Sequence, residues 1–248
     1  MAVGKIMAGV VAVAAVGLLL SCAGSTTSAQ RAETVAPATQ EGMAASLRTR
    51  YLELARAGGG KVFNLDPKLS AVRIYVFRGG QAAKLGHNHV LSAPEFTGFV
   101  YLPASDAADA KFDLEFRLDR LELDNPEYRS AVGGTFATAL PAGAVEGARK
   151  HMLGVDNLQA DRFSFVRIRS VQLTGELPRF AAQIEVEMHG QARTILLPLS
   201  VEGLPGRLSV TGAFVLKQTD FGIEPYSVLG GLLAVKDAVV VEFNLVGT

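Results

Sequence analysis

The stretch Phe112-Asp113-Leu114-Glu115-Phe116-Arg117-Leu118-Asp119 alternates apolar and charged side chains without interruption. Successive side chains of a β-strand point to opposite faces, so this alternation gives one strand an apolar face and a solvated face. The same period of two returns along the chain, in segments separated by turn residues such as His189-Gly190 and Leu177-Pro178. The apolar faces of these segments are Val72, Ile74 and Val76; Ile184, Val186 and Met188; Ile195, Leu197 and Leu199; Leu208, Val210, Gly212 and Phe214; and Val239, Val241, Phe243 and Leu245. The repeated pattern predicts an antiparallel sheet.

The number of strands and the scarcity of helical segments decide the fold class. Less regular strands near residues 96–102 and 163–173 bring the expected total to about eight, with one helical insertion near Ala142–Leu153. This order argues against parallel βαβ units and favours an all-β sandwich or closed barrel. An eight-stranded barrel has room inside for packed side chains or for one small ligand. The alternating pattern alone does not decide between an interior filled by side chains and one that holds a ligand.

Composition narrows the range of partners. The 248 residues are 49% apolar and 19% charged, which is typical of a globular protein. The 24 Lys and Arg residues balance the 24 Asp and Glu residues, so no net field would gather nucleic acid on the surface. We therefore expect no nucleic-acid partner.

The N-terminus has the layout of an export signal. Lys5 precedes an apolar run from Ile6 to Leu20, which is too short to span a bilayer and predicts a signal peptide over residues 1–21. Leu19-Leu20-Ser21-Cys22 resembles the bacterial lipobox, and Cys22 is the only cysteine, so it has no intrachain disulfide partner. We expect acylation of Cys22, which would anchor the protein to the cell envelope. Ala23 after the cysteine points to the outer membrane, facing the periplasm. The alternative is an ordinary secretory peptide with an incidental cysteine.

A tether is expected between the signal peptide and the sheet. Residues 23–40 are rich in Ala, Ser, Thr and Gln and lack apolar periodicity, which is typical of a linker. Met43, Leu47, Tyr51 and Leu54 then recur at helical spacing, which predicts a helix over Glu41–Ala57 that ends at three glycines. The sequence leaves open whether this helix docks on the barrel or lies on the membrane. The expected organisation is a signal peptide (1–21), an acylated tether with a short amphipathic helix (22–60) and a β-barrel domain (61–248).

Several segments together resemble the YceI-like polyisoprenoid-binding family. Asn64–Val72 resembles the opening of that family, Phe96–Val100 its early strand, His189–Leu199 its Gly, Arg and Pro hairpin, and Thr219–Ile223 its late Asp-Phe-Gly element. Asp161–Phe165 resembles the segment before a core strand, although the family usually has proline near the position of Ser164. The resemblance implies an eight-stranded, lipocalin-like β-barrel with an elongated apolar channel. It also implies an isoprenoid ligand, such as a quinone tail or a related amphiphile.

Gly86-His87-Asn88-His89-Val90 is the segment with the most suggestive chemistry. Two histidines separated by one residue lie on the same face of a strand, and imidazoles placed together can bind a transition metal. A third ligand would have to come from His151, His189 or a carboxylate. Contact with a ligand headgroup and a purely structural role are the two other interpretations.

The sequence predicts a binding protein rather than an enzyme. It contains no Gly-x-Ser-x-Gly elbow, P-loop or His-Glu-x-x-His motif, and we expect no catalytic residue and no cofactor. Paired acids such as Asp106 and Asp109, or Glu185 and Glu187, are interpreted as a solvated face. The expected partners are an isoprenoid or fatty amphiphile and the membrane, with a homodimer left open. The residues expected to contact the ligand are Phe112, Leu114, Phe116, Ile184, Val186, Met188, Phe214 and Leu216 in the apolar wall, with His87 and His89.

Overall fold

The computed structural model describes residues 40–248. The expected signal peptide, the expected acylation site at Cys22 and most of the expected linker lie outside the described residues. No helix among residues 40–248 is long and apolar enough to cross a membrane.

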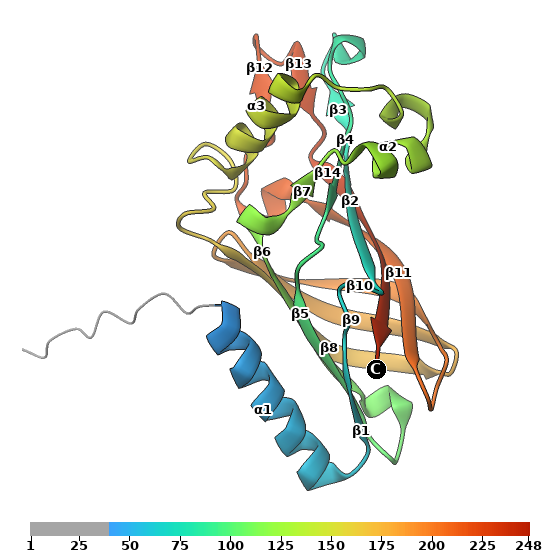
Figure 1. The fold of residues 1–248 in the computed structure, drawn as a ribbon. Coiled ribbons are helices and arrows are strands. Elements are labelled where there is room, and N and C mark those ends of the chain that lie inside the picture. Colours follow the sequence, from blue (N-terminus) through green and yellow to red (C-terminus); the bar gives the residue numbers. More distant parts are fainter. Residues whose placement is uncertain (1–39) are drawn as a thin grey trace, which may run out of the picture. The chain divides into compact units, whose positions relative to one another are not determined.

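One antiparallel sheet forms most of the structure (Figure 1). The order of its strands is β1-β5-β6-β8-β9-β10-β11-β14-β2-β4-β7. Their bounds are β1 Lys61–Asn64, β2 Ala71–Val76, β4 His89–Ser92, β5 Thr97–Leu102, β6 Lys111–Arg117, β7 Glu122–Leu123, β8 Phe165–Glu176, β9 Arg179–Met188, β10 Gln191–Glu202, β11 Leu208–Lys217 and β14 Ala238–Gly247.

The sheet curls until its first strand meets β14. Leu65, directly after β1, forms a bridge with Gly247, and Asn64 and Thr248 exchange backbone hydrogen bonds of 3.0 and 3.1 Å. The edge formed by β1 is therefore paired at this end, as in a barrel. The prediction of an all-β, antiparallel barrel is confirmed.

The main sheet has three strands more than the predicted eight, because the short strands β1, β4 and β7 were not predicted. Asp66-Pro67 separates β1 from β2, and Ala93-Pro94 separates β4 from β5. Proline has no N–H to donate to a sheet, so it interrupts a strand. The main sheet has eleven strand segments in total. A second sheet, of order β12-β13-β3, consists of β12 (Ser227–Val228), β13 (Leu233–Val235) and β3 (Arg78–Gly79).

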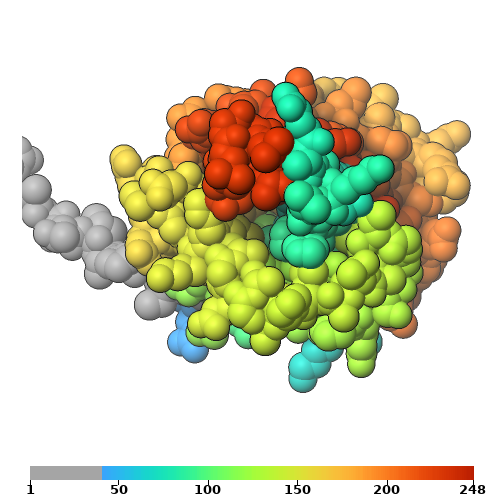
Figure 2. Space-filling model, turned by 90° about the horizontal axis from the view of Figure 1, so that it is seen from above, coloured from blue at the N-terminus to red at the C-terminus, as the bar shows by residue number. Residues whose placement is uncertain are grey.

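The helices cover one end and one side of the sheet. The predicted helices appear as α1 (Gln40–Gly58) and α3 (Ala142–Leu153), and α2 (Pro126–Val132) was not predicted. Short 3₁₀ turns are η1 (Ala83–Leu85), η2 (Ala107–Asp109), η3 (Leu118–Arg120), η4 (Gly134–Phe136) and η5 (Gln218–Phe221). In Figure 1, α2, α3 and the β12–β13 hairpin gather at one end of the sheet. Figure 2 looks onto that end, where β12–β13 (red), the η1 loop (teal) and α3 (yellow) border one another.

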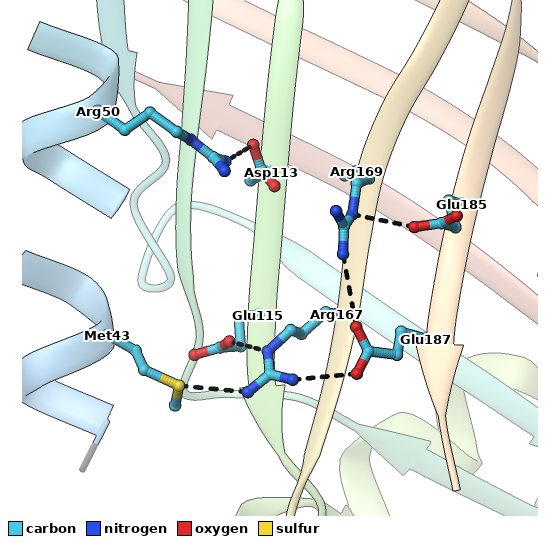
Figure 3. A network of polar contacts seen from close by, with 8 residues as sticks. All are labelled: Met43, Arg50, Asp113, Glu115, Arg167, Arg169, Glu185 and Glu187. Carbon is cyan, nitrogen blue, oxygen red and sulfur yellow. Dashed lines mark hydrogen bonds and ion pairs between the residues drawn. The ribbon is translucent and has the colours of Figure 1, made fainter. Parts of the chain in front are cut away.

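The helix α1 docks on the outer wall of the barrel. Tyr51 is fully buried and stacks on Phe99 of β5, with ring centroids 5.7 Å apart. Its hydroxyl donates a 2.5 Å hydrogen bond to Asp113 of β6, which also pairs with Arg50 (Figure 3). Burial raises the pKa of Tyr51, and the hydrogen bond to Asp113 raises it further. The alternative left open by the sequence is thus resolved in favour of docking.

A ladder of ion pairs runs across β6, β8 and β9 beside α1 (Figure 3). Arg167 pairs with Glu115 at 2.7 Å and with Glu187 at 3.1 Å, and Arg169 pairs with Glu185 at 3.1 Å. Glu115 is buried, although the alternating pattern predicts a solvated position. The helix covers this part of the wall, and Met43 of α1 approaches Arg167 at 3.4 Å. The acids on this outer face therefore form cross-strand pairs instead of standing alone in solvent.

The inner face is apolar. In β10, Leu197 is 2% exposed and Leu199 is 7% exposed, whereas Leu196 between them is 72% exposed. This alternation confirms the predicted period of two. The apolar sets of the predicted strands therefore converge inside the curled sheet.

Candidate functional site

The interior of the barrel is hollow at the end covered by α3 and the β12–β13 hairpin. A cavity of about 490 Å³ lies there, and side chains of the sheet, η1, α3 and the hairpin line it. Most of the lining is aliphatic or aromatic. Its apolar lining includes Val72, Ile74, Val76, Leu91, Phe116, Leu118, Leu121, Leu123, Met152, Leu158, Val166, Ile168, Val186, Met188, Phe214, Leu216, Ile223, Val228, Leu233, Val235, Val239 and Val241.

A smaller apolar cavity of about 110 Å³ adjoins the large one. Val72, Ile168, Phe214 and Val241 line both cavities. The lining of the smaller cavity contains no charged side chain. The two cavities are therefore neighbours inside the barrel, and these four side chains lie between them.

Every residue that the sequence predicts for the ligand site lines one of the two cavities. Six of them, Phe116, Val186, Met188, Leu216, His87 and His89, line only the larger cavity. Three, Phe112, Leu114 and Ile184, line only the smaller cavity, and Phe214 lines both. Their contact with a ligand stays a prediction.

The polar side chains of the larger cavity lie at its open end, beside η1, α3 and the β12–β13 hairpin. They are Arg78, His87, His89, His151, Asn157, Gln218 and Tyr226. Leu85 also lines the cavity and is nevertheless 75% exposed, so the cavity opens to the outside beside η1. An apolar interior with polar groups at its open end matches the two parts of an amphiphile.

Three of these polar side chains already bind backbone carbonyl groups. Arg78 donates to Gly86 at 3.0 Å, Asn157 donates to Glu224 at 3.1 Å, and Gln218 donates to Lys236 at 2.9 Å. Their hydrogen bonds shape the rim of the cavity. Within the described residues, the side chains of His87, His151 and Tyr226 make no hydrogen bond, and His89 binds Asp124 through one ring nitrogen.

His89 is held by a buried carboxylate that the sequence did not reveal. The Nδ1 of His89 lies 2.6 Å from Oδ2 of Asp124, whose side chain has no exposed surface. The other oxygen, Oδ1, accepts hydrogen bonds from Arg129 at 2.6 Å and from the backbone N–H of Val90 at 3.0 Å. Arg129 is itself 3% exposed and also donates to the carbonyl of Asn88 at 2.7 Å.

The local sequence explains how Asp124 reaches this position. It follows β7 and has a φ of 56°, a left-handed conformation that Asp adopts more readily than most residues. Its backbone N–H donates to the carbonyl of Val90 at 2.8 Å, so main chain and side chain both bind β4. Asn125 then caps α2 by accepting from Glu127, and Pro126 occupies the first turn. Arg129 of α2 is thereby placed next to the carboxylate of Asp124.

The carboxylate of Asp124 is ionised in this setting. Burial alone would raise the pKa of the group, but hydrogen bonds from His89 and from the backbone of Val90 outweigh burial and lower it below its usual value. Arg129 adds a further hydrogen bond that lowers the pKa. The group therefore acts as an acceptor for all its partners.

The two histidines of the His-x-His pattern have different surroundings. The strand β4 begins only at His89, and His87 is exposed in the segment before it. Asn88 between them is buried, accepts from the N–H of Arg78 at 2.9 Å and donates to Thr135 at 2.7 Å. The central asparagine thus fixes the segment, and only His89 is oriented by a second side chain.

The third ligand required for a metal site does not appear in the described chain. Among residues 40–248, no three His, Cys, Asp or Glu side chains are grouped so that they could hold a metal ion. His151 packs edge-on against Tyr226, with centroids 4.3 Å apart. His189 lines neither cavity, and its Nδ1 lies 3.0 Å from the carbonyl oxygen of Phe221. The metal interpretation of the His-x-His pattern therefore lacks a third ligand among these residues.

Comparison with known proteins agrees with this architecture. No curated protein matches the sequence. The structure of Burkholderia cenocepacia BcnA is similar, with a TM-score of 0.53 and 14% identity over 74% of this chain and 99% of BcnA. A polyisoprenoid binding domain from Saccharophagus degradans, implicated in plant cell wall breakdown, has a TM-score of 0.50 and 14% identity over 75% of this chain and 97% of that domain. The YceI-like domain matches residues 63–247, and the chain therefore belongs to the YceI-like family.

Proposed function

We propose that this protein binds one isoprenoid-type amphiphile, with its tail inside the barrel and its headgroup at the open end. The observation that carries the proposal is the 490 Å³ cavity, whose wall is apolar and whose polar groups belong to one end. The polyisoprenoid binding domain of similar fold supports the choice of an isoprenoid tail.

The energetics favour an apolar tail. Each buried methylene contributes about 0.8 kcal/mol, so about ten methylenes contribute about 8 kcal/mol before the cost of ordering. No specific polar contact is needed for useful affinity. Affinity should therefore follow tail length until the two cavities are filled.

We also propose a carrier or reservoir in the bacterial cell envelope rather than an enzyme. The lipobox-like Leu19–Cys22 supports an acyl anchor, and Ala23 supports an outer-membrane location facing the periplasm. The oriented imidazole of His89 binds Asp124, and within the described residues it has no hydroxyl or thiol in hydrogen-bond contact to activate. This arrangement suits binding better than nucleophilic catalysis.

Titration of the delipidated full chain with prenols tests the proposal. Geranylgeraniol is expected to saturate the protein at one molecule per chain, and geraniol is expected to bind at least tenfold more weakly because it buries fewer methylene groups. Isothermal titration calorimetry measures the stoichiometry and the dissociation constant of each prenol. Non-saturable uptake, or equal affinity for the two tails, would contradict a tail-filled cavity.

A further inference from the structure

Building on the proposed function, we propose that His89 accepts a hydrogen bond from a hydroxyl headgroup. The protein would then prefer tails that end in a hydroxyl, such as a prenol or a quinol, over the same tails without that donor. The inference rests on the contacts of His89, Asp124 and Arg129 at the wall of the larger cavity.

The contact with Asp124 fixes which nitrogen of His89 carries a proton. An ionised carboxylate can only accept hydrogen bonds, and Oδ2 of Asp124 lies 2.6 Å from Nδ1 of His89. Nδ1 must therefore be the donor. In a neutral imidazole the other nitrogen, Nε2, then presents a lone pair and accepts.

Arg129 supplies the cationic partner of Asp124, so the carboxylate does not depend on a charged His89. Arg129 is buried and lies 2.6 Å from Asp124, so one cation already balances the one carboxylate. A second cation on His89 would leave an uncompensated charge against an apolar cavity, which is costly. The neutral arrangement makes Nε2 a fixed acceptor.

Within the described part of the chain, Nε2 of His89 has no hydrogen-bond partner. His89 lines the larger cavity, and in residues 40–248 its only hydrogen-bonding partner is Asp124, through Nδ1. The side chain is 20% exposed, so a ligand group can reach it. His87 and His151 also line this cavity, but no carboxylate among residues 40–248 orients either ring. His89 is thus the preorganised polar contact of the open end.

A matched pair of ligands isolates this contact. Geranylgeraniol and its methyl ether have the same tail, but only the alcohol can donate a hydrogen bond. The wild-type full chain is expected to bind the alcohol about five- to tenfold more tightly, which is the usual net value of one hydrogen bond. His89→Phe is expected to abolish this preference while binding the ether within about twofold of wild type.

Leu196→Phe is the control, because Leu196 is 72% exposed on the outer face of β10 and lines neither cavity. It should keep the preference for the alcohol. Where His89→Phe does not fold, His89→Leu provides the same loss of the acceptor with a smaller side chain. Ether binding by either variant verifies that its barrel is intact.

Equal binding of alcohol and ether by the wild type would overturn the inference and leave the proposed function standing. An unchanged preference in a folded His89 variant would overturn it as well. If neither ligand bound the wild type, the proposed function would be wrong and the inference with it. These outcomes distinguish failure of the headgroup contact from failure of tail binding.

Discussion

Val186→Trp is expected to lower the affinity of the full chain for geranylgeraniol by at least tenfold. Val186 is 1% exposed, pairs with Ile168 of β8 and lines the larger cavity. An indole there would occupy space that the tail needs. Displacing even two methylenes costs about 1.6 kcal/mol, which is more than tenfold in the dissociation constant. Calorimetric titration measures the change.

Leu196→Trp is the control for Val186→Trp. Leu196 belongs to the neighbouring strand β10, is 72% exposed and lines neither cavity. The same bulky residue on the outer face should leave the affinity within about twofold of the wild-type value, because it takes no space from the tail. Undiminished binding by a folded Val186→Trp protein would place the tail outside the barrel.

Arg129→Met is expected to destabilise the protein by about 3–5 kcal/mol, which is the usual cost of leaving one partner of a buried pair uncompensated. Only 4% of the Arg129 side chain and none of the Asp124 side chain is exposed. The variant would also free the carbonyl groups of Asn88 and Thr138, which Arg129 now binds. Urea unfolding measures the free energy. A loss below about 1 kcal/mol would show that the cluster is not a structural anchor.

Arg117→Met tests the same change at the surface. Arg117 pairs with Asp119 at 2.8 Å, and their side chains are 30% and 43% exposed. Such pairs contribute about 0–1 kcal/mol, so the variant should unfold close to the wild type. A large effect here would mean that loss of any arginine, and not burial of the pair, causes the destabilisation.

Lowering the pH should reduce the difference in the free energy of unfolding between the wild type and Arg129→Met. The pKa of Asp124 is lowered in the folded protein, so the carboxylate contributes stability above its unfolded pKa of about 3.9 and loses it as the pH falls through the folded value. Removing Arg129 takes away one of the hydrogen bonds that lower the pKa. Urea unfolding at pH 7 and below about pH 4 should therefore show the larger difference at pH 7.

Alternation of side chains was sufficient to predict the sheet, because a period of two directly reports the two faces of a strand. It could not predict the small sheet at the open end. The strands β3 and β12 have two residues each, too few to establish a period. The strands β1, β4 and β7 were missed for the same reason, since they have four, four and two residues.

The same alternation identified the apolar lining of the site. Phe116, Val186 and Leu216 were placed on the inner face by their neighbours alone, and all three line the larger cavity. The cluster around His89 was not predictable in this way, because Asp124 is 35 residues away in sequence and meets it only when β7 pairs with β4. The run Asp124-Asn125-Pro126 does contain a helix-start signal, and it could have indicated α2.

Burial of Glu115 shows a second limit of the pattern. Its place in the alternation correctly puts it on the outer face of β6, but the pattern cannot report what covers that face. The docking of α1 and the pair with Arg167 are tertiary contacts. Local periodicity thus assigns a side chain to a face, and packing of distant segments decides its environment.

The central claim is that an isoprenoid-type amphiphile fills the hollow of the barrel. Organic extraction of the full chain purified without added lipid, followed by mass spectrometry of the extract, tests it most directly. The account predicts a molecule with an isoprenoid tail at close to one per chain, and its depletion in Val186→Trp but not in Leu196→Trp. An extract without any such molecule, or one equally rich from both variants, would contradict the claim.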